Sequence, residues 1–309
     1  MNLNAEVIVG DSRETLKALP DKSVQCVVTS PPYWGLRDYG EVEQIGLEQS
    51  PSEFVEQLCL VFDEVWRVLK DDGTIWVNLG DSYAAMRDSK ATPDSLRTGE
   101  GTKVSTAANR NPTNLKAAGL KHKDLAGIPW RFAFAMQDRG WYLRQDIIWA
   151  KPNPMPESVT DRCTKSHEYI FLMTKKPSYF YNHEAIKEDA IWANDEHSDK
   201  RNKRSVWNVS TSRYKDAHFA TYPPDLVQPC ILAGTGEGDT VLDPFSGSGT
   251  TGEVALQHGR NYIGLELNAA YARLSEKRLT DAIGMFGNVI IKDGNSFQAT
   301  SEYEKAENL

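Results

Sequence analysis

Residues 238–268, GDTVLDPFSGSGTTGEVALQHGRNYIGLELN, restrict the fold more than any other stretch of the chain. An apolar run, a glycine loop, a helical pattern and a second apolar run predict a complete β-α-β unit with parallel strands. The loop sets Gly247, Gly249 and Gly252 in the spacing G-x-G-x-x-G, which lets a ligand touch the backbone at a helix N-terminus. Glu266 ends the second strand, where a carboxylate can bind ribose hydroxyls. The unit therefore predicts a parallel α/β sheet with a nucleotide-like ligand at its edge.

The other apolar runs extend this unit into one doubly wound domain. The almost uninterrupted run VQCVVTS is typical of a strand buried on both faces. A 3.6-residue apolar period predicts an amphipathic helix, capped by Ser50 or Ser52 and ended by Asp72 and Gly73. Ser12 is the expected cap of a shorter helix after the first strand. Further strands are expected at residues 6–11, 74–81, 142–152, 167–177 and 288–296, and further helices at 129–141, 223–234 and 269–284. The result is an α/β fold with a mostly parallel, Rossmann-like sheet and helices on both faces.

Two segments are basic although the chain carries a formal charge of −8. Residues 86–123 hold eight basic and three acidic side chains, and residues 199–215 hold six basic and one acidic. They fall in long stretches without an apolar period, 84–124 and 184–218, which are expected to be irregular insertions. Such loops can be no more than solvated surface. Two of them in an acidic chain favour an anionic partner such as nucleic acid.

The residues between the strand and the glycines indicate the charge of the ligand. A carboxylate at Asp243 would repel a pyrophosphate, whereas it would attract a cationic cofactor. Residues 244–250 contain no Lys or Arg and no G-K-[ST] sequence, which argues against a nucleoside triphosphate. The alternative is that Asp243 only caps the helix that follows.

A second motif, VTSPPYW at residues 28–34, forms a corner directly after a buried strand, because two prolines cannot continue a helix or a central strand. Together with residues 242–268, it resembles the amino-methyltransferases of DNA in their beta arrangement, in which the catalytic motif precedes the cofactor motif. The resemblance extends from Asp11 to about Leu279. It implies a Rossmann-like methyltransferase fold, S-adenosylmethionine as the cofactor and double-stranded DNA as the substrate.

The resemblance also implies a chemistry for the corner. An exocyclic amine is a poor nucleophile because its lone pair is delocalised into the ring, and in this family two acceptors bind its protons. The matching acceptors here are Ser30 and the carbonyl of Pro31, which Pro31 and Pro32 hold in place. Tyr33 would stack on the base, which must first leave the duplex. Trp34 either shapes the base pocket or covers the edge of the core.

Other family roles are carried over position by position. For Asp11 the alternative role is that of a turn-forming residue. Arginines and lysines of the second basic segment are the expected DNA contacts. The cofactor-binding candidates are Asp11, Phe219, Pro223, Asp243, Pro244, Phe245, Gly247, Gly249, Thr250 and Glu266. The DNA-binding candidates are Arg201, Lys203, Arg204 and Arg213, and we expect no metal.

The target base and several rival functions stay open at this stage. A serine before Pro-Pro-Tyr favours cytosine N4 over adenine N6, although either amine can donate to Ser30. An NAD-dependent dehydrogenase would share the glycine loop and Glu266 but leaves Pro31 and Pro32 unexplained. A non-catalytic DNA-binding protein and an RNA or protein-amide methyltransferase, whose motif usually begins with Asn, are further alternatives. Carbon-5 methylation needs a cysteine nucleophile, and Cys230 is expected in the core.

Three segments are expected in the domain organisation. Residues 1–183 form the catalytic half, 184–218 a target-recognition insertion, and 219–309 the cofactor-binding half of the same domain. The four isolated cysteines, the absence of a long apolar run and an N-terminus unlike a signal peptide predict a reduced, cytoplasmic protein. A homodimer and a cognate restriction endonuclease are admitted by the resemblance but not decided by the sequence.

Overall fold

The computed structural model describes residues 3–35, 41, 44–84, 119–190, 200–211, 222–284 and 287–294. Within them the main sheet has nine strands in the order β11-β1-β10-β9-β2-β3-β5-β4-β8. Its strands are β1 (Leu3–Val9), β2 (Val24–Thr29), β3 (Leu69–Leu79), β4 (Tyr142–Ala150), β5 (His167–Thr174), β8 (Val206–Asn208), β9 (Thr240–Asp243), β10 (Asn261–Glu266) and β11 (Gly287–Asp293). The helices are α1 (Ser12–Thr15), α2 (Pro51–Val68), α3 (Ile128–Asp138), α4 (Pro224–Gly234), α5 (Thr250–Gln257) and α6 (Ala269–Ile283).

The sheet is parallel except at one strand, as the sequence predicts for a doubly wound fold. The pairs from β11 to β3 are all parallel. The exception is β5, which runs antiparallel to both β3 and β4. This strand therefore brings its amino-terminal end, rather than its carboxyl end, to the edge at which its neighbours end.

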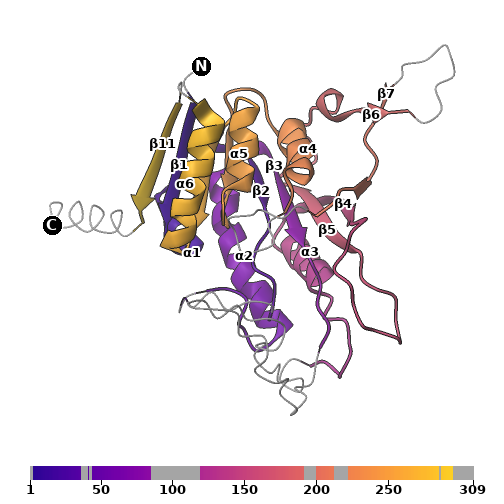
Figure 1. Ribbon diagram of the computed structural model, residues 1–309. Helices are drawn as coiled ribbons and strands as arrows, with labels where there is room; N and C mark the ends of the chain where they lie inside the picture. The colour runs from indigo at the N-terminus through magenta and orange to yellow at the C-terminus, as the bar shows by residue number, and fades with distance from the viewer. Residues whose placement is uncertain are drawn as a thin grey trace, which may run out of the picture.

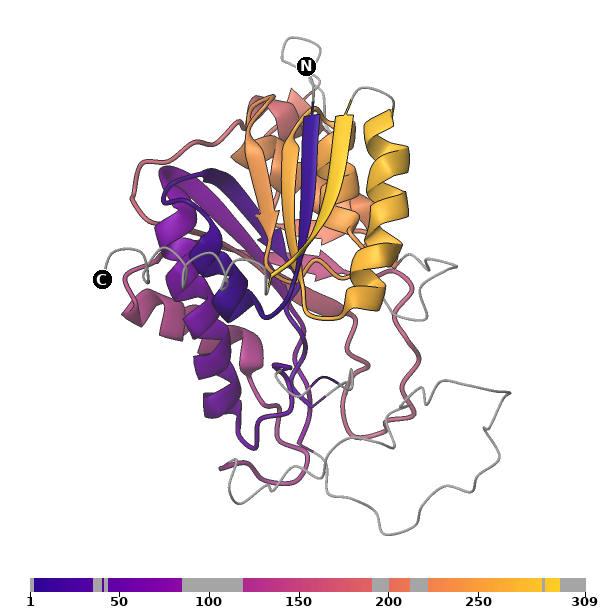
Figure 2. The same cartoon turned by 90° about the vertical axis from the view of Figure 1, so that its left-hand side faces the viewer.

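Helices cover both faces of the sheet. On one face, Phe54 and Leu58 of α2 and Phe132 of α3 pack in one apolar cluster. On the other, Leu226 of α4 and Val254 of α5 belong to a second cluster that α6 completes. Figure 1 shows α4, α5 and α6 side by side, and Figure 2 shows α2 and α6 on opposite sides of the sheet.

The two sequence motifs meet at the centre of the sheet. Strand β9, which leads into the glycine loop, pairs with β2, which leads into the proline corner; Val27 aligns with Leu242. From this pair the chain winds outward in opposite directions, to β3 on one side and β10 on the other. In doubly wound sheets, ligands bind beyond the carboxyl ends of the strands at such a switch point. Strand β1 lies on the β10 side, although it belongs to the amino-terminal segment.

Local signals explain the helix starts better than the helix ends. Ser50 caps α2 in a full capping box with Glu53, as one of the two predicted alternatives. The prediction that Asp72 and Gly73 end this helix is wrong, because the chain turns extended at Leu69 and enters β3 directly. Pairing with β2 decides this, since Leu69 aligns with Val24 before a bulge shifts the register. Ser12 is not a cap; that role falls to Asp11.

The second basic segment is less irregular than expected. Within its described residues, β6 (Glu188–Asp189) and β7 (Lys200–Arg201) form a small antiparallel sheet, preceded by the short 3₁₀ helix η3 (Glu184–Ile186). Strand β8 then adds to the edge of the main sheet, parallel to β4. No helix in the described ranges has the length and apolar character that a membrane span requires.

Candidate active site

A hydrogen bond joins the two motifs where β2 and β9 end. The Thr29 hydroxyl donates to Asp243 Oδ1 over 2.6 Å, and the Thr251 hydroxyl donates to Asp243 Oδ2 over 2.6 Å. Tyr222 donates to Oδ2 at 3.1 Å and the Phe245 N–H donates to Oδ1 at 3.0 Å. The Asp243 side chain is fully buried, and burial raises its pKa. Asp243 is the last residue of β9 and Ser30 directly follows the last residue of β2, so both lie at the same edge of the sheet.

This arrangement settles one alternative for Asp243. The residue does not cap α5, because that helix begins after Gly249. Its carboxylate accepts four hydrogen bonds from the protein, which tie the catalytic and glycine-loop strands together. The attraction of Asp243 for a cationic cofactor stays a prediction. Because Asp243 is buried, its charge would act on the cofactor without direct contact.

The glycine loop needs its glycines for backbone conformation and for close packing. Gly247 has φ +52° and Gly249 has φ +79°, a region that side chains other than glycine rarely occupy. A Cβ on Gly249 would lie 2.8 Å from the Ser275 Cβ of α6. A Cβ on Gly252 would lie 2.5 Å from Tyr262. The spacing therefore serves the packing of α5 as well as the shape of the loop.

Glu266 lies beside this loop at the end of β10. Its Oε2 accepts the Gly247 N–H at 2.8 Å, and its Oε1 accepts the Asn268 N–H at 2.9 Å. Burial raises its pKa to about 7, assisted by the charges of Asp243 and Glu41. Each carboxylate oxygen has a further lone pair, so Glu266 can accept additional hydrogen bonds from a ligand hydroxyl.

The amino-terminal strand contributes to the same edge. Asp11 accepts the Arg13 N–H at 2.8 Å as the cap of α1 and also pairs with the Arg13 guanidinium. Ser12 donates to the carbonyl of Pro244, and the Gly10 N–H donates to the Glu266 carbonyl at 2.9 Å. The structure thus supports the turn-forming role of Asp11 and also places it beside the cofactor candidates. Pro223 is buried at the start of α4, and the predicted Phe219 lies outside the described residues.

The proline corner is held by side chains of β3 and β5, and a lysine directly after β4 supports the β5 residue. Ser30 Oγ donates to Asn78 Oδ1 at 3.2 Å, and Tyr33 Oη donates to Glu168 Oε2 at 2.5 Å. Asn78 Nδ2 donates to the same Glu168 oxygen at 3.1 Å. Lys151 forms an ion pair with Glu168 Oε1, and its Nζ lies 4.2 Å from the centroid of the Trp149 ring.

Sequence analysis did not single out Asn78 or Lys151. Asn78 could have been found from its strand, since parallel neighbours end at the same edge and β3 follows β2. Lys151 follows β4, and Glu168 begins β5, so their meeting depends on the antiparallel direction of β5. No local signal in the sequence gives that direction.

A cavity of about 170 Å³ opens beside Tyr33. The ring of Tyr33 packs on Gly80, where a Cβ would come within 2.6 Å of Tyr33 Cε2. The Arg162 guanidinium lies 3.8 Å from the Tyr83 ring centroid, and burial lowers the pKa of Lys165. The lining residues are Tyr33, Trp34, Gly80, Asp81, Ser82, Tyr83, Ile128, Glu157, Arg162 and Lys165. The cavity thus combines aromatic rings with two cations and two carboxylates, and Arg162 pairs with Glu157 at 2.7 Å.

Trp34 covers the edge of the core, which was one of the two alternatives for it; its role in a base pocket stays a prediction. It lines this cavity and also packs in the core, with 5% of its surface exposed. Its indole N–H donates to the Glu48 carbonyl at 2.9 Å.

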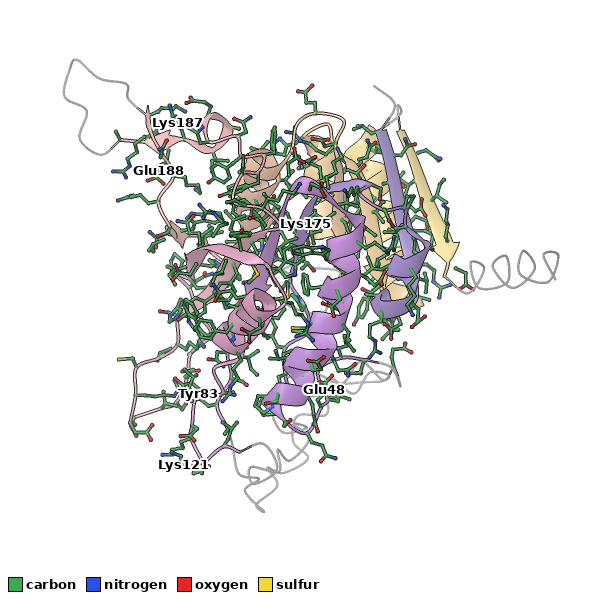
Figure 3. The ribbon with its side chains drawn as sticks, turned by 180° about the vertical axis from the view of Figure 1, so that it is seen from behind. Glu48, Tyr83, Lys121, Lys175, Lys187 and Glu188 are labelled. Carbon is green, nitrogen blue, oxygen red and sulfur yellow. The ribbon has the colours of Figure 1, made fainter. Side chains whose placement is uncertain are left out.

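Two of the predicted DNA contacts, Arg201 and Arg204, lie away from the cavity. Arg201 and Arg204 both pair with Glu188, at 3.0 and 2.8 Å. Figure 3 shows Glu188 at one end of the molecule, and Tyr83 and Lys121 at the other. Lys203 Nζ lies 5.0 Å from the Trp207 ring centroid, and Arg213 lies outside the described residues. Of the basic residues described, Arg162 and Lys165 line the cavity itself.

Cys230 does not offer a nucleophile. It is 1% exposed in α4, and burial raises the pKa of its thiol well above the ordinary value. Since the thiolate is the reactive form, this finding agrees with the prediction that Cys230 is a core residue. Among the described residues, no three His, Cys, Asp or Glu side chains are grouped as metal ligands.

Comparison with known proteins was made at the levels of family, sequence and structure. A family model described as DNA methylase matches residues 24–277. Type II methyltransferase M.Cfr9I of Citrobacter freundii is 50% identical over 281 residues, which cover 89% of this chain and 87% of the relative. Type II methyltransferase M.SmaI of Serratia marcescens is 49% identical over 276 residues, covering 89% and 91%.

Two solved structures share the fold over almost their whole length. TTHA0409 of Thermus thermophilus, complexed with S-adenosyl-L-methionine, has a TM-score of 0.57 and 25% identity, covering 93% of this chain and 99% of that one. The cytosine-N4-specific PvuII DNA methyltransferase has a TM-score of 0.65 and 21% identity, covering 94% and 96%.

Proposed function

The chain belongs to the family of DNA methylases, and on that premise we propose that it methylates an exocyclic amino group of a base flipped out of double-stranded DNA, with cytosine N4 as the target. The observation that carries the proposal is the pairing of β2 with β9. It sets Ser30 next to the glycine-loop strand, with the 2.6 Å bond from Thr29 to Asp243 between the two motifs.

The donor and acceptor groups of the glycine-loop edge fit S-adenosylmethionine, the methyl donor of this family. This molecule has an ammonium, a sulfonium and a ribose but no phosphate. Glu266 has lone pairs for ribose hydroxyls, and residues 244–250 carry no cation for a pyrophosphate. Glu266, Gly247 and Asp11 are the described residues that would hold it. When bound, it supplies an electrophilic methyl group and a sulfur that takes the electron pair of the broken bond.

The proline corner prepares the amine. Ser30 Oγ and the carbonyl of Pro31 accept the two N–H groups, which favours a pyramidal nitrogen whose lone pair is free to attack. The nitrogen forms the new N–C bond with that pair and releases one of its protons to solvent. The proline rings limit rotation of the backbone, so the carbonyl needs little reorganisation. Because the amine attacks the methyl group directly, the reaction needs no covalent enzyme intermediate, and Cys230 is buried.

The cavity beside Tyr33 suits the extruded base. Tyr33, fixed through its hydroxyl and backed by Gly80, offers a ring for stacking. Arg162 and Lys165 provide positive charge for the DNA backbone next to the flipped nucleotide. The choice of cytosine N4 rests on the serine in the first position of the motif, and adenine N6 is the alternative by the same mechanism.

The relatives are named Type II methyltransferases, and we propose that this chain likewise works in a restriction-modification system. A cognate endonuclease and a homodimer belong to this proposal.

The direct test is the DNA of cells that express the protein. Plasmid from cells with the wild-type chain and with Ser30→Ala is sequenced by a modification-sensitive method and digested to nucleosides for mass analysis. We expect one short motif to be modified by the wild type only, with N4-methylcytosine as the product. N6-methyladenine would correct the base, and unmodified DNA from a well-folded wild type would reject the function. A thermal shift with S-adenosylmethionine but not with NAD would separate the dehydrogenase alternative.

A further inference from the structure

The Ser30 hydroxyl of the proline corner differs from a carboxylate, which can only accept hydrogen bonds. A hydroxyl can donate one hydrogen bond as well as accept. If Ser30 donated its proton to a ring nitrogen of the base, it would not have to accept from the amine. Ser30 can therefore act only as an acceptor toward the base if a protein group always accepts the hydrogen bond that its hydroxyl donates.

The amide of Asn78 has only one orientation that its neighbours allow. Its Nδ2 lies 3.1 Å from Glu168 Oε2 and 3.1 Å from the carbonyl oxygen of Tyr169. A main-chain carbonyl can only accept, and so can the carboxylate that Lys151 holds as an ion pair. Turning the amide over would place three oxygens against one another, so Oδ1 must face the opposite side.

On that opposite side, Oδ1 meets the Ser30 hydroxyl at 3.2 Å and the Tyr33 hydroxyl at 3.4 Å. Tyr33 has a single proton and lies only 2.5 Å from Glu168 Oε2, so its proton goes to the carboxylate. The lone pairs of Asn78 Oδ1 are then left for Ser30.

Asn78 is also unable to move aside. It is 3% exposed and lies near the end of β3, with β2 and β5 as its neighbours on either side. Its partner Glu168 is fixed by Lys151. The amide is therefore rigid before any substrate arrives.

From these contacts we infer that Asn78 is a positioning residue, which commits the proton of Ser30 to the protein so that only lone pairs of Ser30 Oγ face the substrate amine. The inference rests on the proposed function. The Lys151–Glu168 ion pair has a role in the same inference. It orients the Asn78 amide, and the amide in turn orients the Ser30 hydroxyl.

The first test measures selection between an amino and an oxo group. Duplexes carry the target base opposite an abasic site, so that unpairing costs nothing, and differ only in cytosine against uracil. Adenine against hypoxanthine is used if the product is N6-methyladenine. Dissociation constants are measured with S-adenosylhomocysteine present. The wild type prefers the amino base, and Asn78→Leu lowers that preference by about tenfold, because a freed hydroxyl can donate to the oxo group. An unchanged ratio overturns the inference.

The second test measures turnover in a double-mutant cycle. Asn78→Leu should lower kcat about tenfold or more with the KM for DNA nearly unchanged, but should cost less than about twofold in a Ser30→Ala background. An equal loss in both backgrounds overturns the inference. If Ser30→Ala shows no measurable turnover, the amino-to-oxo ratio alone decides.

Thr74→Val is the matched control. Thr74 is also fully buried on β3, where it hydrogen-bonds Trp76 and Cys26 rather than the site. It should leave the amino-to-oxo ratio unchanged, and a lower ratio in this variant would show that the ratio reports only general loosening of β3. The wild type keeps the two hypotheses apart: no methyl transfer to DNA rejects the proposed function, whereas normal transfer with an unaffected Asn78→Leu ratio rejects only the inference.

Discussion

The two sides of the candidate site are built in different ways. On the cofactor side, the glycine loop, Gly247 and Glu266 come from a single β-α-β unit, and their contacts are made within about twenty residues of chain. On the catalytic side, Asn78 lies on β3 and Glu168 on β5, whereas Ser30 directly follows β2 and Lys151 directly follows β4. A compact unit keeps its site when its own sequence is kept, whereas the catalytic side depends on how distant strands pair.

The two sides also hold their carboxylates differently. Glu168 is paired with a cation, Lys151, whereas Glu266 accepts two backbone N–H groups and lies near other carboxylates. The ion pair with Lys151 holds the Glu168 side chain in place. Glu266, with its pKa raised to about 7, changes its charge close to neutral pH. We expect the cofactor side to respond to pH and the catalytic side to respond to loss of a single polar atom.

The largest effect should come from Ser30→Ala. Removing one preorganised hydrogen-bonding group from a reacting centre lowers kcat by about a hundredfold or more. Affinity for S-adenosylmethionine should stay within about twofold, because Ser30 bonds Asn78 and not the glycine loop. Steady-state methylation and calorimetric titration check the two quantities. The exposed Ser52→Ala serves as the control, and an equal loss of cofactor affinity would contradict the separation of the two sides.

Gly249→Ala should disturb the cofactor side through stability. The left-handed φ of +79° and the contact of 2.8 Å with Ser275 Cβ together should lower the free energy of unfolding by about 2–4 kcal/mol. Gly284→Ala is the matched control, since its φ is +65° but nothing lies within 4 Å of the added Cβ, so it should lose only about 1 kcal/mol. Denaturant unfolding measures both, and equal losses would mean that packing against α6 is unimportant.

The pH response of Glu266 is the next effect. Its pKa is raised in the folded state, so between its ordinary value and about 7 the folded protein binds more protons than the unfolded chain. Its contribution to stability is thus present at low pH and falls as the pH rises to about 7. Affinity for S-adenosylmethionine should change in the opposite direction, rising up to about pH 7, because the charged carboxylate is the better acceptor.

Glu266→Gln should flatten both pH profiles and weaken the cofactor by about tenfold above neutral pH. Titration calorimetry and thermal unfolding over a pH series provide the measurements. A pH response that survives in Glu266→Gln would come from another group whose pKa is shifted, such as the buried Asp243.

The smallest effect concerns the basic residues at the two ends of the molecule. Arg162→Gln should weaken DNA binding by about threefold to tenfold and reduce the salt dependence, since Arg162 lines the cavity. Arg201→Gln should change binding by less than about twofold, because its partner Glu188 lies at the end of the molecule away from Tyr83. Arg162 is also paired, with Glu157 at 2.7 Å, so the two variants differ in position and not in the presence of a partner. Filter binding at several salt concentrations measures both. The reverse order would restore the second basic segment as the main DNA contact, as the sequence predicted.

Short-range signals in the sequence were sufficient for the β-α-β unit of the cofactor side. Alternating apolar runs and the glycine spacing predicted the parallel units, and the ends of parallel strands meet at one edge, so the neighbourhood of Ser30 and Asp243 followed. The cap at Ser50 was predictable for the same reason, since a capping box involves four consecutive residues. The sequence alone determined these features, because they depend on local geometry and on the fixed handedness of crossover connections.

Tertiary structure decided what depends on distant pairing. Helix α2 ends at Val68, earlier than the turn signal of Asp72 and Gly73 predicts. The reason is that Leu69 pairs with β2 and so begins a strand. The antiparallel entry of β5 brought Glu168 to the proline corner and so gave Ser30 and Tyr33 their partners. Asp243 was turned inward by three side-chain hydroxyls that meet only in the folded protein. Each outcome arises from the burial of surfaces that are far apart in the chain, whose free energy no local pattern records.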